Sequence, residues 1–280
     1  MIVSVLVVVA VVCIVLIVQT TPHPFRFVML DVGQGDASFL ETPTGEQMLV
    51  DGGPSDTVLE RLGRAMPFFD RTIDVVILTH GDADHITGLV EVIRRYRIGR
   101  LLIPGVEKDT ATYREFLDAA RERNVPLTTV RDGDGVTLGD VTVTILAPFD
   151  ATLGLSVNNA GVVARADMDD FSILLTADIE TPVEQLLISR GAMLDADVLK
   201  VPHHGSHSSS TEPFLRAVGP DLALISVGED NRYGHPHSDV VKRYQDLRIP
   251  ILRTDEGSDI RLDVVGKNVS VHRGLGFRVW

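Results

Sequence analysis

The chain has 280 residues and a formal net charge of −13, and Cys13 is its only cysteine. A single cysteine excludes disulfide bonds and thiolate metal sites. The acidic balance argues against nucleic-acid binding through a broad basic face, so a phosphate substrate requires bound cations or a local basic cluster. Any metal ion must be held by His, Asp or Asn side chains and by water.

The first 18 residues are apolar apart from Ser4, which suffices for one helical crossing of a bilayer. No Lys or Arg precedes this segment, and residues 19–22 that follow it make a poor cleavage site for a signal peptidase. We therefore expect residues 1–20 to form a transmembrane anchor, with a cleaved signal segment and a buried strand as the alternatives. Residues 21–280 are expected to form one α/β domain that lies outside the cytoplasm.

The first half of the domain alternates strands and helices. Its predicted elements are a β-hairpin or meander over 25–51, a helix over 54–66, a strand over 73–80, a helix over 86–96, a strand over 98–104 and an amphipathic helix over 112–124. Short strands joined by Gly-Asp turns are predicted over 127–177.

The second half repeats this alternation. Its predicted elements are helices over 182–190, 211–219 and 238–247, strands over 196–204 and 221–228, and closing strands near 250–254, 259–265 and 269–273. Two successive halves of this kind predict two packed sheets with helices outside, a four-layer αββα sandwich.

Two imidazoles and two carboxylates lie within six positions at the end of the predicted strand 73–80: His80, Asp82, Asp84 and His85. In an extended segment the alternating side chains lean to one side, and His85 begins the next helix. Four such groups brought together without a cation would suffer desolvation and carboxylate repulsion. A site for one or two divalent ions removes both costs. The alternative is an exposed acidic loop.

This H-x-D-x-D-H spacing between an apolar strand and a helix resembles the H-x-H-x-D-H signature of the metallo-β-lactamase superfamily. Residues 174–178 (LLTAD), 198–206 (VLKVPHHGS) and 31–37 (DVGQGDA) extend the likeness. Together the motifs resemble the hydrolase domain of ComEC-type DNA-uptake proteins over nearly all of residues 25–275. The resemblance implies the superfamily's αββα sandwich, preceded here by one N-terminal apolar helix in place of a multi-span channel.

The resemblance also implies two divalent ions and assigns their ligands. The first ion takes His80 and Asp82, the second takes Asp84 and His85, and Asp178 bridges them. Asp84 is in addition expected to orient the attacking water or to accept its proton. Hydrolysis would then need no protein nucleophile, because two bridged ions lower the pKa of a bound water.

The superfamily adds a histidine ligand before the bridging Asp, but no histidine lies between residues 86 and 202. The amide oxygen of Asn159 is the expected substitute, with water or partial occupancy as the alternatives. Oxygen donors at Asp82 and Asn159 make the first position harder, which favours Mn²⁺ and admits Mg²⁺, while Zn²⁺ remains a candidate.

Two later histidine motifs complete the expected site. Adjacent residues of a strand point to opposite faces, so one of His203 and His204 is expected to be a ligand, preferably His204, and His203 to contact substrate. His235 is expected to contact phosphate or protonate the leaving group.

Four further contacts with substrate are expected from Gln34, Asp36, Asn231 and His237. The alternatives are a tight glycine turn for Gln34 and Asp36 and a plain surface loop for residues 231–237. Lys200 is expected to form packing or a salt bridge at a strand end.

The leading hypothesis is a membrane-anchored, metal-dependent hydrolase of phosphodiesters. In its most specific version the protein is a nuclease that cleaves single-stranded DNA and works with a separate channel protein. The alternatives are a hydrolase of small phosphoesters or lactones, similar to a phosphorylcholine esterase, and a metal-binding protein that has lost turnover. A nuclease predicts basic side chains beside the metals, from Arg94, Arg95, Arg232 or Lys242. A small-ester hydrolase predicts a closed apolar pocket instead.

Overall fold

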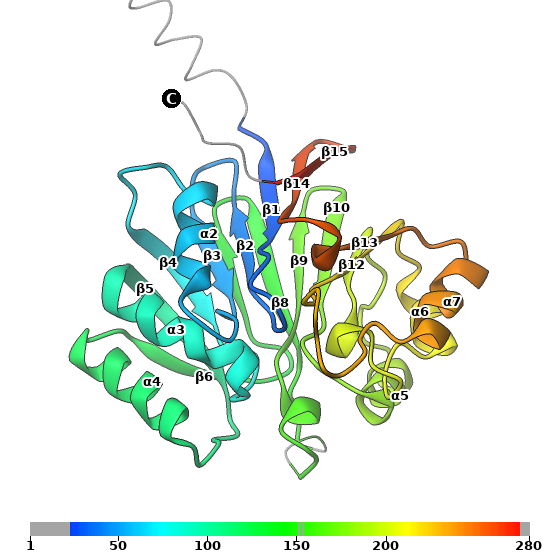
Figure 1. Ribbon diagram of the computed structural model, residues 1–280, viewed down its shortest axis with the longest axis horizontal. Coiled ribbons are helices and arrows are strands. Elements are labelled where there is room, and N and C mark those ends of the chain that lie inside the picture. Colours follow the sequence, from blue (N-terminus) through cyan, green and yellow to red (C-terminus); the bar gives the residue numbers. More distant parts are fainter. Residues whose placement is uncertain (1–22, 151, 153, 275–280) are drawn as a thin grey trace, which may run out of the picture.

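Two β-sheets pack face to face, and helices cover their outer faces (Figure 1). The computed structural model describes residues 23–274 except 151 and 153. The eight-stranded sheet, called sheet A here, has the order β15-β14-β1-β2-β3-β4-β5-β6, and the seven-stranded sheet B has the order β13-β12-β11-β10-β9-β8-β7. The described residues therefore form the αββα sandwich that the sequence predicts.

Sheet A combines the first six strands with the last two. Its strands are β1 (Phe25–Met29), β2 (Ser38–Glu41), β3 (Gln47–Val50), β4 (Thr72–Ile77), β5 (Arg97–Pro104), β6 (Leu127–Val130), β14 (Ile260–Val265) and β15 (Asn268–Arg273). The helices α2 (Thr57–Ala65), α3 (Ala83–Arg95) and α4 (Ala111–Glu122) lie on its outer face.

Sheet B is built from the strands between them. Its strands are β7 (Gly135–Leu138), β8 (Val141–Ala147), β9 (Val163–Met168), β10 (Phe171–Leu175), β11 (Val198–Lys200), β12 (Leu222–Ile225) and β13 (Ile251–Arg253). The helices α5 (Thr181–Ser189), α6 (Glu212–Val218) and α7 (Ser238–Asp246) cover it. Three short 3₁₀ turns are η1 (Asn158–Ala160), η2 (Pro202–Gly205) and η3 (Thr254–Glu256).

Three apolar cores separate the four layers. In β1, Phe25, Phe27 and Met29 face the core between the sheets, whereas Val28 packs in the core under α2, α3 and α4. This strand is buried on both faces, which explains why its sequence is continuously apolar apart from Arg26. A third core lies between sheet B and its helices.

The direction of the strands gives the molecule two different ends. In sheet A, β3, β4, β5 and β6 are parallel, and β1 runs with them because both β1 and β3 are antiparallel to β2. In sheet B, β10, β11 and β12 are parallel. We call the side where these strands end the strand-end edge and the opposite side the strand-start edge. The motif residues follow the ends of β1, β4, β10 and β11.

Two local features differ from the sequence predictions. Helix α3 begins at Ala83 rather than at residue 86, so Asp84 and His85 lie in its first turn. The strand predicted over 196–204 ends at Lys200, and His203 and His204 adopt left-handed backbone conformations, with φ values of 48° and 52°. His203 and His204 therefore do not lie on opposite faces of a strand, and that prediction is wrong.

The expected anchor over residues 1–20 lies outside the described residues. Within the part of the chain that the structure describes, no helix is both long and apolar enough to cross a membrane.

Candidate metal centre

Four buried side chains converge at the strand-end edge: Asp36, His85, Asp178 and His204. Each offers one ligand atom, and these atoms lie within 4.8 Å of one another. Asp178 Oδ2 is 3.3 Å from His85 Nε2 and 3.3 Å from His204 Nε2. Two of the four follow strands of sheet A and two follow strands of sheet B, so packing of the sheets assembles this cage. We call these four residues the cage.

The histidines around the cage are held by their Nδ1 atoms. His85 Nδ1 donates to the Asp51 carboxylate at 2.8 Å, and His204 Nδ1 donates to the Ser226 carbonyl at 2.8 Å. His80 Nδ1 is 3.0 Å from Thr79 Oγ1, whose hydroxyl donates to Asp51 at 2.6 Å.

The opposite atoms, Nε2 of His80, His85 and His204, are buried and have no hydrogen-bond partner among the described residues. A buried polar atom without a partner is costly. A metal-bound imidazole commonly donates its second ring nitrogen to a carboxylate or carbonyl, which is the arrangement seen here. The donor set therefore fits a divalent cation held by Nε2 atoms and carboxylate oxygens.

The electrostatics of the cage are those of a site that attracts positive charge. Burial lowers the pKa of His85, but the Asp178 and Asp51 carboxylates outweigh it and raise this pKa well above its ordinary value. Burial raises the pKa of Asp178, but His204, His85 and Lys200 outweigh it and hold that pKa well below the usual range. Asp178 is thus ionised, and it stabilises cations beside it.

Lys200, at the end of β11, fixes two carboxylates of the cage. Its buried ammonium group donates to the Ala177 carbonyl at 2.7 Å, pairs with Asp36 Oδ2 and lies 3.5 Å from Asp178 Oδ1. This leaves Asp178 Oδ2 and Asp36 Oδ1 facing the histidines. The salt bridge expected of Lys200 is present, and Asp36, expected to contact substrate, belongs to the cage.

Asp84 and Asp82 lie at the partly exposed mouth of the cage. Asp84 Oδ2 is 3.7 Å from His204 Nε2. Asp82 precedes α3 at the N-cap position, but its side chain caps no backbone N–H and instead accepts a hydrogen bond from Lys108 Nζ at 2.6 Å. The structure thus places Asp84 beside the cage and Asp82 in an ion pair.

Asn159 does not point into the cage. Its Oδ1 accepts a hydrogen bond from the backbone N–H of Glu180 at 2.9 Å, and its Nδ2 donates to the Glu180 carboxylate at 2.7 Å and to Ser156 Oγ at 2.9 Å. Both amide atoms therefore fix η1 against the segment after β10.

Comparisons with known proteins agree with this geometry. The model of the metallo-beta-lactamase superfamily matches residues 30–229. The chain belongs to this superfamily. Its solved relatives include the metallo-beta-lactamase fold protein YhfI from Bacillus subtilis, which is 15% identical, has a TM-score of 0.56, and aligns over 84% of this chain and 98% of that one.

Two curated proteins are similar in sequence to this member of the metallo-β-lactamase superfamily. ComE operon protein 3 of Bacillus subtilis is 34% identical over 83% of this chain and 32% of its own length. Recombination protein 2 of Haemophilus influenzae is 29% identical over 84% of this chain and 28% of its own length. The chain thus spans about a third of the length of these relatives.

Further histidines line one side of the cage. His203 is partly exposed, and its Nε2 lies 3.9 Å from Asp178. The ring of His235 is 5.7 Å from that of His203 and 6.3 Å from that of His204. Burial, followed by the charges of His204 and His203, lowers the pKa of His235 to about 4. His235 is therefore neutral at pH 7.

The remaining expected contacts have structural partners. Asn231 holds the loop of His235, because its Oδ1 accepts from the His235 N–H at 2.8 Å and its Nδ2 donates to the His235 carbonyl at 2.7 Å. His237 stacks on His207 with ring centroids 3.5 Å apart. Gln34 accepts a hydrogen bond from the Gly228 N–H at 3.3 Å and does not point at the cage.

Gly35 lets the backbone of the 31–37 motif approach the start of α3 closely. A Cβ at this position would lie 2.2 Å from the carbonyl oxygen of Asp84, and the N–H of Asp36 donates to that same oxygen at 3.1 Å. Only glycine allows this approach. The motif therefore presses Asp36 against the start of α3.

Sequence reasoning missed Asp51, Thr79 and Lys108. The first two orient His85 and His80, and Lys108 holds Asp82. The position of Asp51 directly after a buried strand and before Gly52-Gly53 is a signal that could have identified it. Lys108 lies in the loop before α4 and has no such signal.

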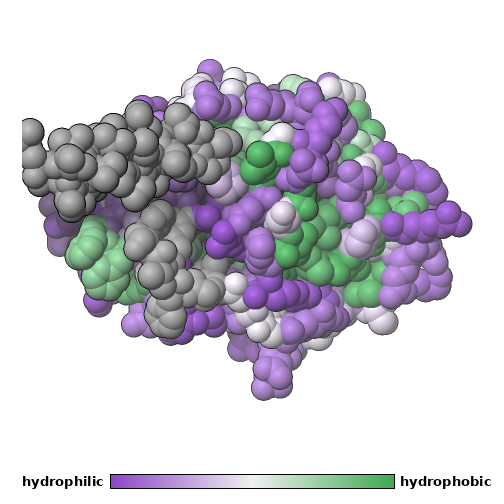
Figure 2. Space-filling view, turned by 90° about the horizontal axis from the view of Figure 1, so that it is seen from above, coloured by the Kyte–Doolittle hydropathy of each residue, from purple (hydrophilic) through white to green (hydrophobic). Residues whose placement is uncertain are grey.

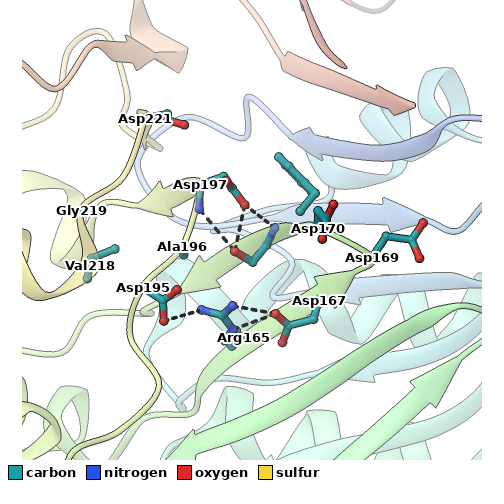
Figure 3. Close-up of a pocket in the computed structure, with 12 residues that line it drawn as sticks. Arg165, Asp167, Asp169, Asp170, Asp195, Ala196, Asp197, Val218, Gly219 and Asp221 are labelled. Carbon is teal, nitrogen blue, oxygen red and sulfur yellow. Dashed lines mark hydrogen bonds and ion pairs between the residues drawn. The ribbon is translucent and has the colours of Figure 1, made fainter. Parts of the chain in front are cut away.

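A second hollow lies at the strand-start edge of sheet B and contains no motif residue (Figure 3). Its lining includes Arg165, which lies 2.8 Å from Asp167 and 3.7 Å from Asp195. The other charged groups around it are aspartates, which repel phosphate. This hollow therefore does not compete with the cage as a site for an anionic substrate.

Proposed function

We propose that this chain is a metal-dependent hydrolase of phosphodiester bonds, with single-stranded DNA as its substrate. The observation that carries the proposal is the set of three buried imidazole Nε2 atoms without hydrogen-bond partners around the ionised Asp178. We propose two divalent ions, Mn²⁺ or Zn²⁺ with Mg²⁺ as a further candidate. His80, Asp82 and Asp178 would hold one ion. The second would be held by Asp178 together with Asp36, Asp84, His85 and His204.

Such ions supply an activated water near neutral pH and positive charge for the phosphate oxygens. The chain supplies the orientation of both reactants. Asp84, at the mouth of the cage, is placed to accept a hydrogen bond from the attacking water. Asp51 and the Ser226 carbonyl keep His85 and His204 in the tautomer whose Nε2 is a ligand.

His235 is proposed to hydrogen-bond a phosphate oxygen from the outer side of the site. Because its pKa is about 4, the ring is neutral at pH 7 and has no extra proton to give a leaving group. This favours a phosphate contact over leaving-group protonation. His203, also at the rim, is proposed to contact the substrate from the Glu180 side.

Two basic side chains flank the site. Lys108 lies at Asp82, and Arg232 packs over the ring of Tyr233 at 5.1 Å. The other basic residues considered from the sequence are paired elsewhere: Arg94 and Arg95 with Glu91, and Lys242 with Asp246. The name of Recombination protein 2 of Haemophilus influenzae, which refers to recombination, supports a nucleic-acid substrate.

We further propose that residues 1–20 anchor the protein in a membrane, with the catalytic domain outside the cytoplasm and a separate channel protein as partner. The apolar sequence of this segment supports the anchor.

The test is hydrolysis of bis(p-nitrophenyl) phosphate and of end-labelled single-stranded DNA by the full chain with Mn²⁺, Mg²⁺ or Zn²⁺. We expect turnover with at least one ion and a loss of more than about 100-fold in Asp84→Ala and Asp178→Ala, because both remove carboxylates at the ions. The control His272→Gln, on the exposed strand β15, should retain full activity.

Two outcomes would contradict the proposal. Hydrolysis of a phosphomonoester or lactone without cleavage of either diester would favour the small-ester alternative. A wild-type protein that binds metal but is inert toward every substrate would be the non-catalytic metal-binding protein.

A further inference from the structure

We propose that the strand-start edge of sheet A rests on the surface of a lipid bilayer, with the cage pointing away from it. The inference rests on the membrane anchor proposed above and not on the hydrolytic activity. The described part of the chain enters sheet A at this edge, because β1 begins there at Phe25. The same edge holds the turn between α2 and β4 and the hairpin between β14 and β15.

The turn before β4 exposes two adjacent phenylalanines. Phe68 and Phe69 are 68% and 91% exposed, and their ring centroids lie 4.9 Å apart. An exposed pair of large aromatic side chains is unfavourable in water and marks a contact surface. Aromatic rings at this position would enter the interfacial layer of a bilayer.

Apolar side chains also lie on the other side of the chain entry. In the β14–β15 hairpin, Val265 and Val269 are 50% and 40% exposed. Strand β14 neighbours β1, and β4 lies three strands away on the opposite side, a span of about 14 Å. The anchor sequence thus joins the domain between two exposed apolar tips.

Positive charge accompanies the phenylalanines. Arg71 Nη1 donates to the Phe68 carbonyl at 3.1 Å, and the Arg97 N–H donates to the Arg71 carbonyl at 2.7 Å. Both arginines are exposed, and neither has a carboxylate within 4.0 Å among the described residues. The guanidinium group of Arg71 is held by the Phe68 and Asp70 carbonyls, and a guanidinium charge without a paired carboxylate beside an apolar tip fits the anionic headgroups of a lipid surface.

Sheet B differs at this end. Asp169, Asp170 and Asp221 gather around the hollow of Figure 3 and would repel anionic headgroups. Figure 2 looks onto this end of the molecule, where green hydrophobic surface lies on both sides of the grey atoms, with the broader area to the right and a smaller one to the left. We therefore expect the sheet A side of the domain to contact the bilayer.

The orientation determines where the site opens. Strand β4 has six residues, or about 20 Å of extended chain, between the turn with Phe69 and the segment with His80. The cage would therefore face the aqueous phase and take its substrate from water rather than from the lipid.

The test places a fluorescent nitrobenzoxadiazole label at one cysteine in the full chain, reconstituted in vesicles of neutral and anionic phospholipids. The background is Cys13→Ser, since Cys13 is the only cysteine. The labelled variants are Phe69→Cys and the control Leu155→Cys, whose side chain is 40% exposed in the loop between β8 and β9 at the strand-end edge.

We expect a blue-shifted emission at position 69 and several-fold stronger quenching by nitroxide-bearing lipids than at position 155. In Arg71→Gln the quenching at position 69 should lose its dependence on anionic lipid.

Equal quenching at both positions would overturn the orientation. A blue shift at position 69 without lipid quenching would also overturn it, because a protein segment would then cover the phenylalanines. Protein that does not sediment with the vesicles would refute the anchor itself. None of these results depends on turnover, so the hydrolase proposal is tested separately.

Discussion

At the residue scale, the two halves of the proposed metal centre differ in how freely their donors can bind. The cage residues have free donor atoms that are already oriented by Asp51, Lys200 and the Ser226 carbonyl. Asp82 is instead paired with Lys108, and Asn159 is occupied by Glu180. A cation at His80 and Asp82 must therefore displace the ammonium group of Lys108. It also lacks the Asn159 oxygen that the sequence predicts as a further ligand. We expect the two ions to bind with unequal affinity.

Replacing Lys108 by methionine should strengthen the weaker of two binding events. The Lys108→Met variant retains the apolar stem but removes the charge that competes for Asp82. Isothermal titration of the metal-free protein with Mn²⁺ should show this affinity rising by about 5-fold, which is about 1 kcal/mol, the upper end of the range for a partly exposed pair.

The control for this titration is Lys267→Met, which removes an exposed lysine that lies in the turn between β14 and β15 and pairs with Asp170. It should leave both binding events unchanged. Identical isotherms for Lys108→Met and the wild type would show that Lys108 does not compete with the metal.

At the scale of elements, ion pairs connect β1 to both of its neighbouring strands in sheet A. Arg26 lies in register with Glu41 on β2 and Asp263 on β14, and it pairs with them at 2.7 and 3.0 Å. Arg26 is buried and its two partners are partly buried, and these three charges join β14 and β2 to β1 between them.

Asp263→Asn should destabilise the fold at neutral pH and much less at acid pH. Burial raises the pKa of Asp263, but Arg261 and Arg26 outweigh it and hold the pKa below its ordinary value. A carboxyl with a lowered pKa contributes stability above its unfolded pKa, and the contribution disappears as pH falls through the folded pKa. We expect urea unfolding to show a loss of about 1–3 kcal/mol at pH 7 that shrinks at pH 3.

The matched control is Asp246→Asn, an exposed partner of Lys242 on α7. Its effect should stay below about 0.5 kcal/mol at either pH. A loss for Asp263→Asn that is the same at pH 7 and pH 3 would mean that packing, and not charge, carries the effect.

The sequence predicts the layers and most donors of the site because these depend on local pattern. Apolar strands followed by His80, Asp178 and His204 mark both the core and the edge where the site forms. The left-handed turn at His203 and His204, directly before the close contact of Gly205 with Pro236, has no comparable signal in the sequence. The Lys108–Asp82 pair likewise depends on tertiary contact.

At the scale of the whole molecule, the cage connects the two sheets at one edge. Asp36 and His85 follow strands of sheet A, whereas Asp178 and His204 follow strands of sheet B. Without a cation, the carboxylates are balanced by Lys200 and by protons on the histidines. A bound divalent ion would add a direct link across the interface between the sheets.

Metal binding should therefore raise the unfolding temperature of the full chain in detergent. At 100 times the dissociation constant, binding to the folded state alone adds about 2.7 kcal/mol, or about 5–10 °C. Differential scanning fluorimetry with Mn²⁺ should show this shift, and a chelator should reverse it. His204→Gln should lose the shift and His272→Gln should keep it; a shift of equal size in His204→Gln would place the ion elsewhere.

The order of the cage residues along the chain has a consequence for how the protein acquires its metal. During synthesis, Asp36 and His85 emerge long before His204, and the donors meet only when the second sheet has formed on the first. A nascent chain, or one threaded unfolded through a translocon, therefore has no finished chelate and carries no tightly held ion with it. The identity of the resident ion is then set by the ion supply of the compartment in which the protein completes its folding.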